Sequence, residues 1–164
     1  KASHSPARDA LAEVVNLHDV ALDFEPIYRV VFDVDGEKML EELREYAKSL
    51  KGSATPQTVY YILGEAEGDI IFERPVQQLA VGTLQDFLDA YKKNNPKVEV
   101  DYIHDESSLR ALAEKENSVG FLFDGMGKNE LFKTVIFDGA LPRKTFSMGH
   151  ARDKRYYLEC RKIK

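Results

Sequence analysis

The chain has almost no cysteine and no long apolar run. Among its 164 residues Cys160 is the only cysteine, so the chain can form no internal disulfide and has no thiolate set for a zinc site. This pattern predicts a protein of a reducing compartment, the cytoplasm. The longest apolar runs are only a few residues, whereas a helix needs roughly 20 apolar residues to cross a bilayer. We therefore predict no membrane span.

Several motifs that carry chemistry are absent as well. The four histidines are spread out without metal-ligand spacing, so no metal site is predicted. Residues 120–129 contain three glycines and Lys128, but the phosphate-loop spacing fails because Asn129 follows the lysine. No serine stands in a Gly-x-Ser-x-Gly elbow, and no nucleic-acid-binding motif is present. The sequence identifies neither catalytic residues nor a cofactor, and it does not favour a nucleic-acid partner.

What is present is an uneven distribution of charge. The net charge is −5, yet residues 141–164 hold eight Lys or Arg against two acidic residues, a local charge of +6. The rest of the chain therefore carries −11. A basic end on an acidic body can steer an anionic ligand, or it can dock onto that body. Both interpretations are open at this point.

Hydrophobic periodicity predicts helices and strands without strict alternation. Met39, Leu40 and Leu43 begin a helical stripe that Gly52 should stop, and Thr83 should cap a second helix. The predicted helices are 36–52, 84–95, 105–117 and 128–139; the predicted strands are 9–17, 24–34, a hairpin over 57–75, 97–104, 118–124 and 155–163. We predict an α+β fold, a mixed or largely antiparallel sheet with about four helices packed on it. Residues 1–164 should form one domain, and 52–56 is where a boundary would be sought.

The segment after the last predicted helix is the best candidate site. Between residues 139 and 155, turn-forming and hydroxyl residues are interleaved with cations, which suits recognition of a phosphate or carboxylate. The candidate ligand-binding residues there are Arg143, Lys144, Thr145, Ser147, Lys154 and Arg155. The alternative is that these side chains form a solvated face or pair with the acidic body.

A second candidate lies in the predicted strand 24–34. Glu25 and Arg29 should lie on one face, because side chains alternate along a strand, and Tyr28 should lie on the other. The pair could line a cleft. It could equally be a strand-edge pair that fixes register.

Two stretches, "VVNLHDVALDFEPIYRVVF" (14–32) and "DGALPRKTFSMGHARDKRYYLECRKI" (138–163), resemble the C-terminal half of the bacterial domain-of-unknown-function family 1015. The resemblance implies a C-terminal half of a longer protein, holding one wall of a site whose other wall lies in an N-terminal half. Tyr28 and His150 depart from the family pattern, so the resemblance gives neither an acid–base role. The family-like positions are Glu25, Pro26, Arg29, Pro142, Arg143, Lys144, Thr145, Ser147, Gly149, Lys154, Arg155, Tyr156 and Glu159.

Two functional hypotheses follow. The first is that the chain forms part of a small-molecule enzyme, for example a nucleotide-dependent phosphotransferase. Residues 141–164, which we call the basic segment, would contribute anion contacts. Phosphoryl transfer depends largely on positioning and charge neutralisation. The second is a non-catalytic docking module that packs on an N-terminal half or self-associates, since symmetric homo-oligomers are the commonest assemblies. The partners expected are accordingly a small anionic molecule, the N-terminal half or a second copy.

Overall fold

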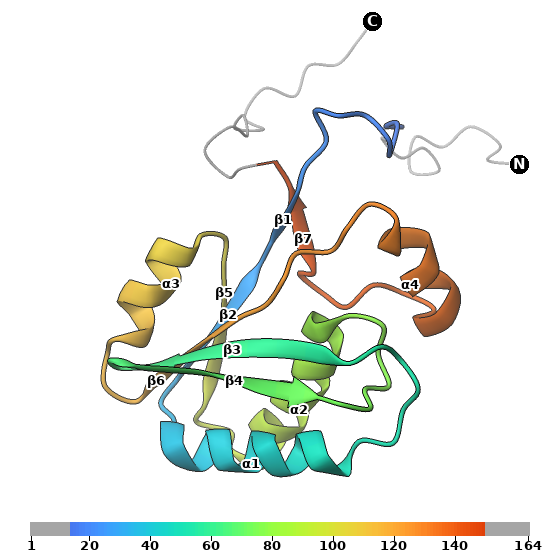
Figure 1. Cartoon of the computed structure of the whole chain (residues 1–164). Coiled ribbons are helices and arrows are strands. Elements are labelled where there is room, and N and C mark those ends of the chain that lie inside the picture. Colours follow the sequence, from blue (N-terminus) through green and yellow to red (C-terminus); the bar gives the residue numbers. More distant parts are fainter. Residues whose placement is uncertain (1–13, 150–164) are drawn as a thin grey trace, which may run out of the picture.

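The computed structural model describes residues 14–149, which form an α+β fold with a five-stranded sheet, a separate two-stranded sheet and four helices (Figure 1). The helices are α1 (Gly36–Ser49), α2 (Ala80–Asn94), α3 (Glu106–Ala113) and α4 (Glu130–Asp138). The strands are β1 (Phe24–Pro26), β2 (Tyr28–Phe32), β3 (Gln57–Leu63), β4 (Ala66–Phe72), β5 (Glu99–Ile103), β6 (Ser118–Leu122) and β7 (Phe146–Met148).

The larger sheet is antiparallel throughout, with the order β4-β3-β6-β2-β5. Its central strand, β6, comes last in sequence and inserts between β3 and β2, so that Gly120 pairs with Val30 on one side and Ile62 on the other. All five residues of β6 are buried. The predicted α+β class is therefore confirmed, and the sheet is the antiparallel form of the prediction.

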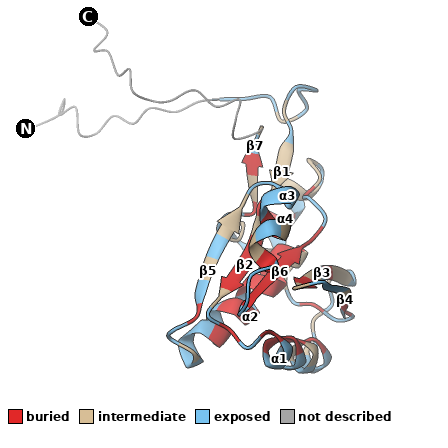
Figure 2. Ribbon diagram, turned by 90° about the vertical axis from the view of Figure 1, so that its left-hand side faces the viewer, coloured by how far each residue is buried: buried red, intermediate tan, exposed pale blue. Residues whose placement is uncertain are grey.

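Helices cover the two faces of this sheet unequally. Helices α1 and α2 pack on one face through the main hydrophobic core, which Val31 joins from β2. Its neighbour Val30 points to the other face, where α3 contributes Leu109 and Ala113 to a smaller cluster. Helix α3 approaches closely because Gly120 has no side chain: a Cβ there would lie 2.9 Å from the Cβ of Ala113. Figure 2 shows the buried residues concentrated in β2, β6 and the inner sides of the helices.

Local signals explain where two helices begin and where another ends. Asp35 caps α1 by accepting a hydrogen bond from the Lys38 amide at 3.2 Å, and Asp105 caps α3 in the same way. Helix α4 ends at Gly139, whose φ of 83° is readily adopted only by glycine. These three helices match the predicted ones to within a few residues.

Four details of the prediction are corrected or lie outside the described residues. Residues 14–17 of the predicted first strand are not in a strand, and residues 9–13 are not described. Thr83 is not an N-cap: α2 begins one turn earlier, and the buried Thr83 hydroxyl donates to Gln57 Oε1 at 2.7 Å instead. Gly52 does not stop α1, which ends at Ser49 with Leu50 as its C-cap. The predicted strand 155–163 lies outside the described residues.

Candidate functional site

The basic segment, which we predicted as a loop, contains strand β7 and folds back on the body of the protein. Strand β7 pairs with β1 in a two-stranded ribbon above the main sheet, with Ser147 opposite Glu25 (Figure 1). The Thr145 hydroxyl donates to the Pro142 carbonyl at 2.5 Å, and the Ser147 hydroxyl donates to the Gly149 carbonyl at 3.3 Å. Both side chains are buried and stabilise the local backbone. The candidates Lys154 and Arg155 lie outside the described residues.

Arg143 is held by the protein's own side chains. Its Nε donates to the Tyr102 hydroxyl at 2.9 Å, and its guanidinium pairs with Asp89 on α2. The hydrogen bond to Tyr102 and the charge of Asp89 raise the pKa of Arg143. Lys144, next in the chain, is exposed at a positive φ of 54°. In its described part, residues 141–149, the segment therefore contacts the acidic body through Arg143, which was the alternative interpretation of its charge.

Because the Arg143 side chain is 59% exposed, its ion pair should contribute little to stability. We expect Arg143→Gln to lower the free energy of unfolding by less than about 1 kcal/mol, and less at high salt. Urea unfolding of this variant beside Lys144→Gln measures the effect. A loss as large as that of a buried residue would show that Arg143 anchors the segment.

Arg29 is the buried counterpart of this docking. It is fully buried, its Nε donates to Gln85 Oε1 at 3.0 Å and its Nη2 donates to the Arg143 carbonyl at 3.0 Å. Its Nη1 donates to the carbonyl of Ile27. The guanidinium also lies over the Tyr102 ring, 4.6 Å from the centroid. Burial lowers the pKa of Arg29 to about 10, so the side chain remains charged at neutral pH.

The predicted ion pair between Glu25 and Arg29 is not formed in the described part of the chain. The two residues belong to different strands, because the chain leaves β1 at Pro26 and enters β2 at Tyr28. Side-chain alternation therefore does not carry across Ile27. Arg29 acts as an internal link between β2, α2 and the basic segment.

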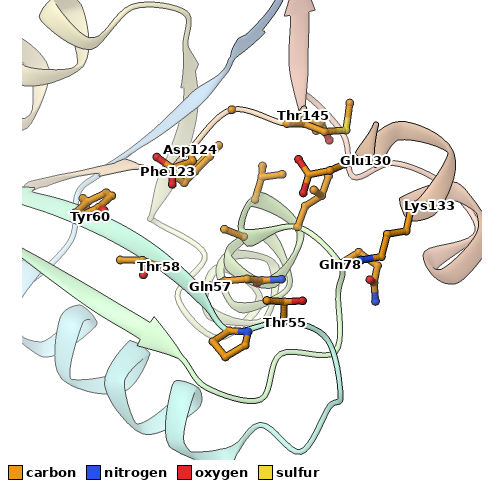
Figure 3. A pocket seen from close by; sticks show the side chains of 16 residues that line it. Thr55, Gln57, Thr58, Tyr60, Gln78, Phe123, Asp124, Glu130, Lys133 and Thr145 are labelled. Carbon is orange, nitrogen blue, oxygen red and sulfur yellow. The ribbon is translucent and has the colours of Figure 1, made fainter. Parts of the chain in front are cut away.

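A cavity of about 340 Å³ opens between the start of α2, the start of α4 and strand β3 (Figure 3). Of the described candidate residues, only Thr145 lines it. The lining residues are Thr55, Pro56, Gln57, Thr58, Tyr60, Gln78, Leu79, Ala80, Val81, Phe123, Asp124, Gly125, Met126, Glu130, Lys133 and Thr145. The cavity thus lies beside the basic segment, and most of its lining residues come from other parts of the chain.

The amino end of α2, where the helix dipole is positive, lies at this cavity, because Leu79, Ala80 and Val81 line it. The helix begins after Leu79, no side chain caps it, and its first turn holds no acidic residue. The amides of Ala80 and Val81 have no acceptor within the helix, as in any first turn. Unpaired amides and the helix dipole together favour an anion at this position.

Other contacts hold this helix end in place. Gln57 accepts from Thr83 and donates to the Gln77 carbonyl at 2.7 Å, so one side chain fixes both the helix and the segment before it. The amide of Gln78 donates to the Asp138 carboxylate at 2.8 Å, which ties the end of α4 to the same segment. The donors at the cavity therefore sit on a well-supported frame.

Charged and hydroxyl side chains give the cavity two different ends. The side chains of Lys133, Thr55 and Thr58 make no hydrogen bond or ion pair with residues 14–149, so their side-chain donors are open to a ligand. Glu130 accepts from the Gly127 amide at 2.7 Å, which occupies one carboxylate oxygen. Asp124 lies at the other side, near Tyr60. An anionic group fits the α2 end, and hydrogen-bond donors fit the Asp124 end.

A second cavity of about 450 Å³ continues this site toward α3, and the two share Tyr60, Phe123 and Asp124. Aromatic rings and carboxylates line it. The cation within it, Arg110, is paired with Glu67 and Glu106. Burial, followed by the nearby carboxylates, raises the pKa of the Tyr28 hydroxyl.

Most residues of this site carry no local sequence signal of a binding role. Lys133 could be recognised only as one charged residue of a predicted helix, and Thr55 as part of the turn-forming stretch 52–56. The start of α2 was missed because its first turn, Ala80–Gly82, contains none of the residues that usually mark a helix start. What brings these residues together is tertiary packing.

Within residues 14–149, no group of three or more His, Cys, Asp or Glu side chains is arranged to hold a metal ion. None of the described helices is both long enough and apolar enough to pass through a membrane. No family model, curated protein or solved structure matches the chain.

Proposed function

We propose that this protein binds a small molecule carrying a phosphate or carboxylate group, with that group at the amino end of α2. The observation that carries the proposal is an uncapped helix start facing a cavity in which Lys133, Thr55 and Thr58 have open donors. Amides at a helix start, hydroxyls and an ammonium group are the donors that proteins use for such anions. Asp124 and Tyr60 would then accept hydrogen bonds from the rest of the ligand.

The site also explains why a basic segment accompanies the cavity. Lys144 is exposed and precedes Thr145, which lines the cavity, so it adds positive charge near the opening, whereas Arg143 is paired with Asp89. Charge of one sign near a cleft raises the local concentration of an oppositely charged ligand. The segment would steer an anion without touching it.

The prediction that the chain belongs to a larger phosphotransferase goes beyond ligand binding and remains a prediction. Holding a phosphate-bearing group in position is the part of that chemistry that the cavity supports, because positioning and charge neutralisation dominate phosphoryl transfer. Which group would be transferred, and with which nucleotide, stays open to assay. Cytoplasmic location likewise stays a prediction.

The proposal is tested by titrating the whole chain with inorganic phosphate and with acetate, and following amide signals by NMR. We expect saturable shifts at residues 79–82 and 133. Choline chloride serves as the cationic control and should leave these signals unchanged. An absence of saturable shifts with both anions would contradict the proposal.

One substitution tests the Lys133 ammonium group, and a second serves as its control. Lys133→Gln should weaken phosphate binding by roughly five- to tenfold, on the order of 1 kcal/mol for a charge at a partly exposed site. Lys93→Gln, the same change in the last turn of α2, is the matched control and should have no effect. Equal losses in the two variants would point to general electrostatics rather than a site.

Ala80→Pro removes one amide donor while leaving the helix intact. Proline is well tolerated at the first helical position, and the preceding Leu79 already has the extended conformation that proline requires, with φ −119° and ψ 143°. We expect unchanged thermal stability and weaker phosphate binding. Binding that equals the wild type would show that this amide is not a ligand contact.

A further inference from the structure

Helix α4 presents apolar side chains to solvent along most of its length. Phe132 is 64% exposed, Ile136 is 76% exposed, and Val135 and Phe137 are exposed as well. Among the residues of this helix only Thr134 is buried. The helical spacing of Leu131, Phe132, Val135 and Ile136 underlies the predicted helix 128–139, but of these four only Leu131 packs against the core.

The spacing gives this surface a continuous ridge. Phe132, Val135 and Ile136 are separated by three and four residues, so they lie on one side of the helix. Lys133 lies beside the ridge and lines the cavity described above. The ridge is therefore a surface separate from the proposed ligand site.

The apolar area of the ridge is a large part of what a protein partner covers. Phe132, Val135 and Ile136 together expose roughly 300 Å². A standard interface buries about 800 Å² per partner, of which about 57% is apolar, or roughly 450 Å². The ridge on α4 alone thus offers roughly two-thirds of the apolar area that one side of a stable dimer contributes.

The arrangement of the ridge fits a second copy of the same chain. Phe132 and Ile136 lie two residues before and two residues after Thr134. Two α4 helices packed antiparallel through their exposed sides, with a two-fold axis at the height of Thr134, therefore place each Phe132 against the partner's Ile136. A two-fold contact requires such a self-complementary surface. The ridge itself contains no charged residue, so it does not select a partner of opposite charge.

We propose that α4 is the interface of a symmetric homodimer. This inference is independent of the proposed anion site, because the ridge and the cavity use different residues. It gives the docking hypothesis a definite surface, which is α4 rather than the basic segment.

Sedimentation equilibrium over about 1–500 μM tests the proposal. The wild-type mass should rise with concentration from 18.7 kDa toward twice that value. Phe132→Lys and Ile136→Lys should each weaken the dimer at least tenfold, because each puts a charge into the ridge while keeping a good helix former. Val20→Lys is the control: Val20 is 93% exposed and lies outside α4, so the dimer should be unchanged.

A wild-type chain that stays monomeric up to 500 μM would overturn the proposal. So would a dimer that survives both α4 substitutions, or one that Val20→Lys weakens equally. Hydrogen exchange of the wild type at low and high concentration gives a check that needs no variant. Amides of residues 130–138 should exchange more slowly in the concentrated sample, and unchanged exchange there would place any interface elsewhere.

Discussion

Arg29→Met should lower the free energy of unfolding by about 2–4 kcal/mol, one of the two largest effects we expect from a single substitution. The change removes the donors that serve Gln85 Oε1, the Ile27 carbonyl and the Arg143 carbonyl. A buried acceptor left without a donor costs about 1–3 kcal/mol. Methionine carries no charge, so the variant avoids the cost of burying the guanidinium, a cost that lowers the pKa of Arg29. This gain offsets part of the loss.

The pKa of Arg29 also determines how this effect varies with pH. In the folded state the pKa is about 10, below the ordinary value of arginine in the unfolded chain, so the unfolded state binds more protons only above about pH 10. The contribution of the guanidinium to stability is therefore constant below about pH 10 and rises with pH above it. Urea unfolding at pH 6 and at pH 8 should give the same loss for Arg29→Met.

Two further variants distinguish a buried network from a simple loss of packing. Arg44→Met is the matched control, since Arg44 lies over the Tyr61 ring and bonds its hydroxyl at 3.2 Å, and its loss should be under about 1 kcal/mol. Adding Gln85→Leu to Arg29→Met removes one unpaired acceptor, so the double variant should lose less than the two single losses combined. Strict additivity would contradict the network.

Gly52→Ala should have a comparably large effect, about 2–4 kcal/mol, for a steric reason. A Cβ at Gly52 would lie 1.9 Å from the Pro75 carbonyl oxygen, and backbone atoms cannot move aside as the end of a flexible side chain can. The segments must separate. That movement breaks the Gly52 amide bond to the Arg74 carbonyl, which measures 2.8 Å.

Denaturant unfolding with Ser53→Ala as the control checks this effect. Ser53 is exposed and adjacent, and its replacement should change stability by less than about 0.5 kcal/mol. Because Thr55 and Gln78 flank the two segments and line the cavity, phosphate binding should weaken even in Gly52→Ala molecules that stay folded. A stability equal to the wild type would mean that Gly52 and Pro75 are not packed together.

The local elements of the fold were predictable because their signals are local. Met39, Leu40, Leu43 and Ala47 are buried in α1, as their helical spacing indicates. The hairpin of β3 and β4 turns near Gly64, whose φ is 59°, where the sequence placed glycines. Each of these features depends on residues close together in the chain.

Long-range pairing and burial were not predictable from the same information. Nothing in residues 118–122 indicates that this strand sits between β2 and β3, because strand order depends on contacts between distant segments. Arg29 carries the sequence signature of a surface cation, and the acceptors from Gln85, Arg143 and Ile27 permit its burial. The candidate site shares this difficulty, since its donors come from three separate parts of the chain, namely residues 55–58, the start of α2 and Lys133.

The ribbon of β1 and β7 determines how the protein should respond to mechanical force. Phe24 pairs with Met148, and both strands continue outward from that end of the ribbon toward residues 14 and 149. Tension applied at those residues loads the ribbon as a zipper, in which the pairs open one after another, rather than in shear, in which they resist together. The ribbon, with its stacked Phe24 and Phe146 rings, should thus open first, and the distance between residues 14 and 149 should increase. The five-stranded sheet would remain folded behind them.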